Sequence, residues 1–127
     1  MDTPLILIVD DEPEITKLYA FALHNAGFEV IIAENGLKGI AAAKSPRRPV
    51  LILMDVKMPV MDGVEAFIKL KDDPTTKDIK VIFMTAFADP RALELDTKIA
   101  KEVGAVELIT KDIDIDELVK KVKQALS

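Results

Sequence analysis

Five short apolar runs alternate with segments of helical periodicity along the chain. The runs are rich in Val, Ile and Leu, and the central one carries no polar alternation, which is typical of a strand covered on both faces of a parallel sheet. They span Leu5–Val9, Phe28–Ala33, Val50–Met54, Lys80–Thr85 and Val106–Thr110. Because strands and helices alternate, the pattern predicts an α/β fold. We expect a doubly wound, five-stranded parallel sheet in the flavodoxin-like order 2-1-3-4-5, with five helices on its two faces.

Each helix is expected between residues that start or stop helices, namely side-chain caps, Gly and Pro. The first expected helix carries an apolar stripe from Ile15 to Ala26, and the second runs from Gly36 to Lys44. The third starts at a cap on Asp62, the fourth runs from Asp89-Pro90 to about Val103, and the fifth starts at a cap on Asp114. Gly63 is expected to let the chain turn tightly just ahead of the third helix. The alternation is continuous, so the sequence predicts one compact domain.

Two of the predicted strands run directly into carboxylates. The first ends at Asp10 and Asp11, and the central one ends at Asp55. In the predicted order these strands are neighbours, so the three acids meet in the crevice where open α/β sheets bind ligands. Like charges this close repel one another unless a cation lies among them. Oxygen ligands without His or Cys favour Mg²⁺, so the sequence predicts a magnesium site at this edge.

Two further polar side chains end neighbouring strands. Thr85 closes the fourth strand, and Lys111 directly follows the fifth. Together with the acids they form the set that phosphoryl transfer requires: a carboxylate nucleophile, acids that hold Mg²⁺, a hydroxyl donor and an ammonium that meets phosphoryl charge. The candidate chemistry is therefore phosphoryl transfer.

Composition argues against several classes of function and location. The net charge of −5 argues against a protein that binds nucleic acid through general electrostatics. Cys is absent and the single histidine, His24, falls off the apolar stripe of its helix, so thiolate and histidine metal sites are excluded. No apolar run reaches the roughly 18 residues that a membrane span requires, and the start of the chain lacks the basic region of a signal peptide. We expect a cytoplasmic protein.

In order and spacing, these residues resemble the receiver domain of two-component response regulators, over essentially the whole chain. The matching segments are Val9-Asp10-Asp11, Met54-Asp55-Val-Lys-Met-Pro59 with Asp62-Gly63, Met84-Thr85-Ala86, and Gly104-Ala105 followed by Lys111. The resemblance implies that residues 1–127 form a single receiver domain. It also implies a phosphoacceptor signalling domain, not an enzyme, that promotes its own phosphotransfer and dephosphorylation.

The resemblance further implies a role for each site residue. Asp55 would be the phosphoacceptor, with a histidine kinase or a histidine phosphotransfer protein as the phosphodonor. Thr85 and Lys111 would contact the phosphoryl oxygens and move when they arrive. The implied Mg²⁺ ligands are Asp10, Asp11, Asp55 and the main-chain carbonyl of Lys57.

Phosphorylation would then act as a population switch, since new charge on Asp55 favours the conformer in which Thr85 and Lys111 close over it. The resemblance suggests that the readout surface is built from the fourth helix, the fifth strand and the fifth helix, and that it meets a downstream protein partner. We expect no direct nucleic-acid or membrane binding by this domain. A monomer and a phosphorylation-dependent dimer both fit the sequence.

Several positions depart from the family pattern. Asp112 follows Lys111 where many receivers have Pro, so we expect a trans peptide or local strain there. Leu108 stands where many receivers carry Tyr or Phe. Lys57 and Phe87 occupy positions that tune dephosphorylation in this family. The departures at positions 108 and 112 are the basis for one alternative, a pseudo-receiver that signals by protein binding without phosphorylation.

Two other classes fit the sequence less well. Magnesium-dependent phosphohydrolases with an aspartate nucleophile carry a second acid two residues after it, and here that residue is Lys57. Dinucleotide-binding domains carry Gly-x-Gly-x-x-Gly after the first strand, and this chain does not. A free-standing regulator and a piece of a larger regulator or hybrid kinase are equally compatible with the sequence.

Overall fold

The computed structural model describes residues 3–86 and 98–127. Within these ranges five strands form one parallel sheet in the order β2-β1-β3-β4-β5, which confirms the predicted topology. The strands are β1 (Leu5–Val9), β2 (Glu29–Ala33), β3 (Leu51–Asp55), β4 (Lys80–Thr85) and β5 (Glu107–Thr110). Every strand begins and ends within one residue of its predicted bounds.

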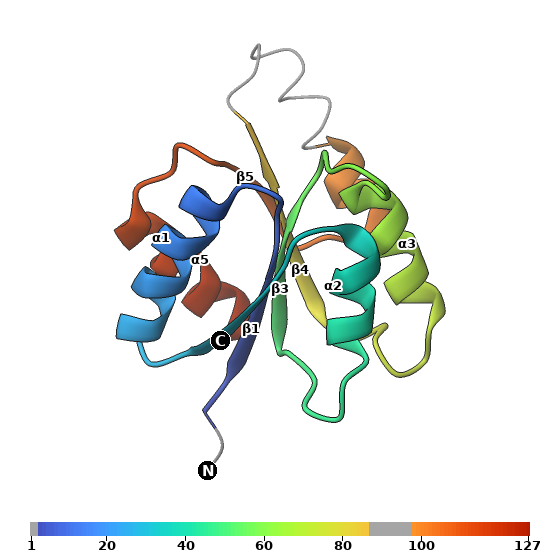
Figure 1. Cartoon of the computed structure of the whole chain (residues 1–127), viewed down its shortest axis with the longest axis horizontal. Coiled ribbons are helices and arrows are strands. Elements are labelled where there is room, and N and C mark those ends of the chain that lie inside the picture. Colours follow the sequence, from blue (N-terminus) through green and yellow to red (C-terminus); the bar gives the residue numbers. More distant parts are fainter. Residues whose placement is uncertain (1–2, 87–97) are drawn as a thin grey trace.

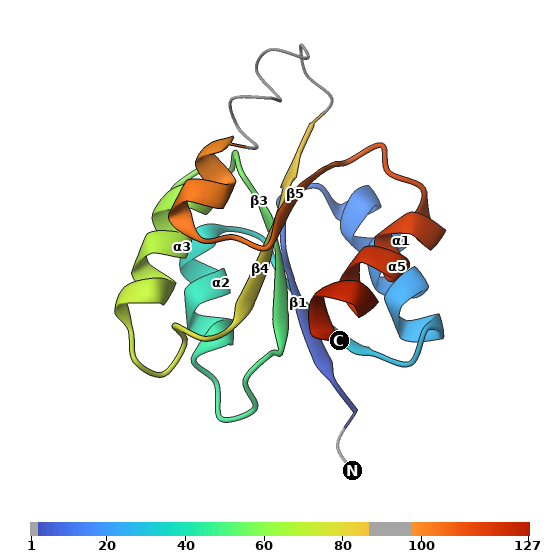
Figure 2. The same ribbon diagram turned by 180° about the vertical axis from the view of Figure 1, so that it is seen from behind.

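Helices cover both faces of this sheet. Those with defined bounds are α1 (Pro13–Asn25), α2 (Gly36–Ala43), α3 (Gly63–Asp72) and α5 (Ile115–Leu126). Residues 98–103 are also helical and lead into β5. Helices α1 and α5 cover one face, and α2, α3 and residues 98–103 cover the other (Figures 1 and 2). The predicted helix start at Asp89-Pro90 lies outside the described residues.

The core lies on both sides of the sheet, because alternate side chains of the central strand enter different layers. Leu51 and Leu53 pack with the side chains under α1 and α5, whereas Ile52 and Met54 pack on the side of α2 and α3. All four are fully buried. The central strand is therefore an unbroken apolar run because it is buried on both faces, as the sequence predicts. No helix within the described ranges is long and apolar enough to cross a membrane.

The helix starts next to the sheet edge follow local rules. The side chain of Asp62 accepts a hydrogen bond from the amide of Glu65, and Asp114 caps α5 in the same manner, as predicted. Gly63 meets a packing requirement in addition to the expected tight turn, which stays a prediction. A Cβ atom at this position would lie 2.1 Å from the carbonyl oxygen of Asp55. Only Gly lets the backbone of α3 pack this closely against the end of β3.

Candidate functional site

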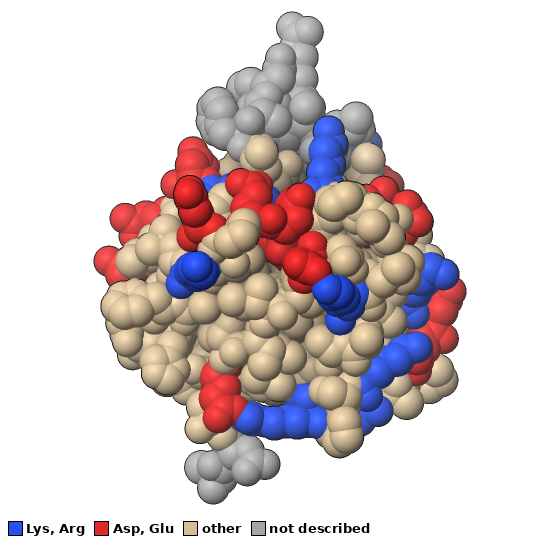
Figure 3. Space-filling view, in the orientation of Figure 1, with Lys and Arg blue, Asp and Glu red and all other residues tan. Residues whose placement is uncertain are grey.

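The predicted acids meet at the carboxyl ends of β1 and β3. Val9 pairs with Met54, so the next residues, Asp10 and Asp55, stand at equivalent positions on neighbouring strands. Both are buried, with 2% and 4% of their surface exposed. Asp11 lies at the same edge, as predicted, and is exposed. In Figure 3, Asp and Glu side chains gather over the end of the sheet where β1 and β3 stop.

Lys111 is the cation at the centre of this acidic cluster. Its ammonium lies 2.9 Å from Asp55 Oδ2, 2.9 Å from Asp10 Oδ2 and 2.6 Å from Glu12 Oε1. The Lys111 side chain is only 7% exposed. Three carboxylates therefore share one buried ammonium, and this arrangement leaves an excess of negative charge in the crevice.

The main chain brings Thr85 and Lys111 to the same edge. Thr85 ends β4 and is 8% exposed. Its carbonyl oxygen accepts a hydrogen bond of 2.8 Å from the amide of Lys111. Thr110, the last residue of β5, pairs with Thr85, and Lys111 follows Thr110 directly. Thr85 and Lys111 therefore lie at the same edge of the sheet. The sequence thus identified all four polar strand ends that the fold brings together.

Burial dominates the electrostatics of Asp55. Burial raises the pKa of this carboxyl from its usual value of 3.8 to about 6. The hydrogen bond from Lys111 lowers the pKa in part, and the negative charge of Asp10 raises it further. Burial also lowers the pKa of Lys111, but hydrogen bonds to Glu12, Asp55 and Asp10 outweigh it, and the net pKa is raised. Lys111 therefore stays charged at neutral pH, whereas Asp55 changes its protonation state near pH 6.

The loop after β3 contacts Oδ1 of Asp55, the carboxylate oxygen that does not face Lys111. The amide of Lys57 donates a hydrogen bond of 3.3 Å to Asp55 Oδ1. The carbonyl of Val56 in turn accepts a hydrogen bond of 2.8 Å from Gly63, which ties the loop to the start of α3. The backbone of Lys57 therefore lies beside the carboxylate, and the role of its carbonyl as a metal ligand stays a prediction.

The chemistry of these donors fits a hard divalent cation. One carboxylate oxygen each from Asp10, Asp11, Glu12 and Asp55 lies within 4.8 Å of the others. Asp10 Oδ2 is buried, and the Lys111 ammonium lies 2.9 Å from it. An oxygen-only donor set that includes buried carboxylates is suited to Mg²⁺.

Two residues of the site escaped the sequence reasoning. The sequence pattern assigns no role to Glu12, yet its carboxylate contacts Lys111. Tyr19 was assigned to an apolar stripe, yet its hydroxyl donates a hydrogen bond of 2.8 Å to the carbonyl oxygen of Lys111. The signals were present: Glu12 is the third consecutive acid after β1, and a buried tyrosine hydroxyl requires a partner.

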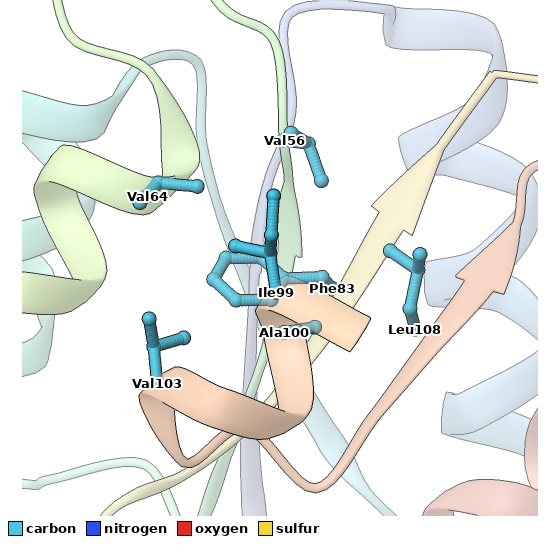
Figure 4. Close-up of a pocket in the computed structure, with 7 residues that line it drawn as sticks. All are labelled: Val56, Val64, Phe83, Ile99, Ala100, Val103 and Leu108. Atoms are coloured by element: carbon cyan, nitrogen blue, oxygen red, sulfur yellow. The ribbon is translucent and has the colours of Figure 1, made fainter. Parts of the chain in front are cut away.

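The departures from the family pattern have structural outcomes. The peptide between Lys111 and Asp112 is trans, as expected. Leu108 is half-buried and lines an apolar cavity of about 90 Å³ between β4, β5, α3 and residues 98–103 (Figure 4). Its other lining residues are Val56, Val64, Phe83, Ile99, Ala100 and Val103. Phe87 lies outside the described residues.

Comparison with known proteins establishes the family. The family described as response regulator receiver domain matches residues 6–123, so the chain belongs to the receiver domains of two-component signalling. It is 38% identical to protein PilH of Pseudomonas aeruginosa, over 96% of this chain and 97% of PilH. It is also 38% identical to sporulation initiation phosphotransferase F of Bacillus subtilis, over 95% of this chain and 92% of that protein.

Other relatives are longer. The phosphate regulon transcriptional regulatory protein PhoB of Pseudomonas aeruginosa is 43% identical over 95% of this chain, which spans only 51% of PhoB. The chain likewise spans 49% of the transcriptional regulator RpaA of Synechocystis. It therefore corresponds to about half the length of these two relatives.

Solved structures share the fold. Chemotaxis protein CheY4 of Vibrio cholerae superposes with a TM-score of 0.85 at 27% identity, over 98% of this chain and 99% of CheY4. The Mn²⁺-bound form of response regulator Rcp1 superposes with a TM-score of 0.76 at 27% identity, over 95% of this chain and 90% of Rcp1. The order of strands and helices described above is thus that of CheY-like receivers.

Proposed function

We propose that this chain is a phosphoacceptor of a two-component system, in which Asp55 takes a phosphoryl group from a phosphohistidine of a histidine kinase or histidine phosphotransfer protein. A carboxylate oxygen of Asp55 forms the new P–O bond as the P–N bond breaks, and the imidazole nitrogen keeps the electron pair. The observation that carries this proposal is a buried Asp55 carboxylate with the Lys111 ammonium 2.9 Å away.

The same acids are suited to hold the Mg²⁺ that this transfer would require. We assign Asp10, Asp11, Asp55 and the main-chain carbonyl of Lys57 as its protein ligands. When bound, Mg²⁺ supplies positive charge to the acids and to phosphoryl oxygens. The clustering of the carboxylate oxygens of Asp10, Asp11 and Asp55 supports this assignment, as does the Mn²⁺-bound form of the related Rcp1. Cation binding would also release Lys111 from part of its present acidic contacts.

Lys111 would act on the phosphoryl group during its transfer, and Lys111 and Thr85 would both act on it once it is attached. The ammonium of Lys111 already touches Asp55 and would meet the added negative charge. Thr85 ends the neighbouring strand one residue beyond Met84, which pairs with Asp55, and from there its hydroxyl would donate to a phosphoryl oxygen. Closure of both groups over the phosphorylated Asp55 would shift the population of conformers, and this shift is the signal that we propose for the chain.

Protein partners would meet two surfaces. Helix α1 begins directly after the acids and exposes two large apolar side chains, Leu18 (48%) and Phe21 (64%), which favours it as a contact for a protein phosphodonor. The readout surface for a downstream protein would comprise residues 98–103, β5 and α5, and the phosphorylated chain would stay monomeric or dimerise there. The acidic net charge of −5 supports protein partners over direct contact with nucleic acid.

Intact-protein mass after incubation with acetyl phosphate tests this function. We expect a single phosphoryl adduct that requires Mg²⁺, that is absent from Asp55→Asn and that persists in Asp78→Asn, a matched change at an exposed aspartate outside the site. If the parent shows no adduct, beryllofluoride binding separates rapid hydrolysis from a site that does not react. Failure of both would contradict the phosphoacceptor function and favour the pseudo-receiver.

A further inference from the structure

We propose that Tyr19 is a positioning residue for phosphoryl transfer, an inference that rests on the phosphoacceptor function proposed above. Its hydroxyl fixes the main chain at Lys111, and the fixed main chain holds the Lys111 ammonium against Asp55. The carbonyl oxygen of Lys111 accepts this hydrogen bond at 2.8 Å. Tyr19 and Lys111 are 92 residues apart in sequence, so the contact links the first helix to the end of the fifth strand.

Lys111 needs such an anchor because it lies beyond the strand ladder. Strand β5 ends at Thr110, and residues 111 and 112 form a turn. The amide of Lys111 is held by the carbonyl of Thr85 on β4. Its own carbonyl is held by the Tyr19 hydroxyl. The two peptide groups that flank the Lys111 Cα atom are therefore tied to different elements, and this fixes the direction in which the side chain leaves the backbone.

The next residue does not supply this rigidity. Asp112 is exposed, and no ring restricts its φ angle as a proline ring would. Within the part of the chain that the structure describes, one backbone hydrogen bond closes the turn locally, from the amide of Ile113 to the carbonyl of Thr110 at 3.1 Å. Without the Tyr19 hydroxyl, the peptide after Lys111 would be restrained by that local hydrogen bond but no longer anchored to α1, and it would gain freedom to rotate. A small rotation there moves the ammonium, which lies at the end of a long side chain.

Tyr19 itself is a rigid anchor. The residue is 1% exposed and packs with Ile6, Ile8 and other core side chains between the sheet and helices α1 and α5. Burial raises the pKa of its hydroxyl, and the nearby charge of Lys111 acts against this rise. The hydroxyl therefore remains protonated and able to donate throughout the neutral pH range.

Tyr19→Phe is the variant that isolates this contact, since it removes the hydroxyl and keeps the ring in the core. We expect phosphorylation of Asp55 by saturating acetyl phosphate to slow by about two- to tenfold, the effect of losing one neutral hydrogen bond. The KM for acetyl phosphate should change little. Thr16→Val is the matched control, because Thr16 is a buried hydroxyl on the same helix whose hydrogen bond goes to Pro13. Its rate should equal that of the parent.

A double-mutant cycle separates positioning from general structural support. If Tyr19 acts through Lys111, Tyr19→Phe should have no further effect on the phosphorylation rate in a Lys111→Met background. Thermal unfolding of each variant verifies that it is folded. An unchanged phosphorylation rate in Tyr19→Phe would overturn the role of Tyr19 but not the phosphoacceptor function. An equal loss of rate in the parent and in the Lys111→Met background would do the same. A parent protein that takes up no phosphoryl group and binds no beryllofluoride would overturn the phosphoacceptor function as well.

Discussion

Replacing Asp55 by Asn should stabilise the folded protein at neutral pH in metal-free buffer. Burial raises the pKa of Asp55 from its usual 3.8 to about 6 even though Lys111 donates to it. A carboxyl with a raised pKa favours the folded state only while it is protonated. This contribution is complete below pH 3.8 and is lost as the pH rises through about 6. Ionised Asp55 therefore costs the fold about 3 kcal/mol above that pH.

Asn has nearly the same shape and stays neutral, so it avoids this cost. The free energy of unfolding of Asp55→Asn should exceed that of the parent by up to about 3 kcal/mol at pH 8, and the two should converge near pH 4. Urea unfolding followed by circular dichroism across this range, with a chelator present, measures the difference. Asp78→Asn serves as the matched control, because Asp78 is exposed and lies outside the site.

Magnesium should diminish the advantage of the variant. A cation among the acids favours ionised Asp55, so saturating Mg²⁺ should stabilise the parent more than Asp55→Asn. A variant that is less stable than the parent at pH 8 without metal would refute the reasoning. A stability difference that does not change with pH would refute it equally, since burial of a titrating carboxyl could not then be its cause.

Further predictions concern residues around the site. Gly63→Ala should destabilise the fold by about 1–3 kcal/mol in urea unfolding, because its Cβ would meet the Asp55 carbonyl; an unchanged free energy would refute this packing. Asp10→Asn should weaken Mg²⁺ binding by about tenfold or more in isothermal titration calorimetry, and equal affinity would exclude Asp10 as a ligand. Phe21→Ser should slow transfer from a phosphorylated histidine phosphotransfer protein by about two- to tenfold, but not from acetyl phosphate. Equal slowing with both donors would contradict a docking role.

The sequence predicts the strand ends well for a physical reason. Strands β1 and β3 are covered on both faces, so their sequences are continuous apolar runs, and a carboxylate that interrupts such a run must mark its end. The caps Asp62 and Asp114 are equally local, because each acts on an amide two or three residues ahead. Patterns whose cause lies within a few residues are visible in the sequence.

Contacts that depend on distances between elements are not visible in this way. The hydrogen bond from Tyr19 to Lys111 requires a specific spacing between α1 and the turn after β5, and helical periodicity does not carry that spacing. The requirement for Gly63 likewise follows from how closely α3 approaches β3. Glu12 reaches Lys111 only because β1 and β5 end at the same edge of the sheet. These contacts had to come from the structure.

The most direct measurement for the phosphoacceptor function is chemical trapping of the acyl phosphate. Borohydride reduces an aspartyl phosphate to homoserine, which peptide sequencing by mass spectrometry locates. After incubation with acetyl phosphate and Mg²⁺, we predict that homoserine replaces aspartate at position 55 alone, and only when both reagents are present. Homoserine at Asp10 or Asp11, or its absence from a protein that carries a phosphoryl adduct, would contradict the assignment of Asp55.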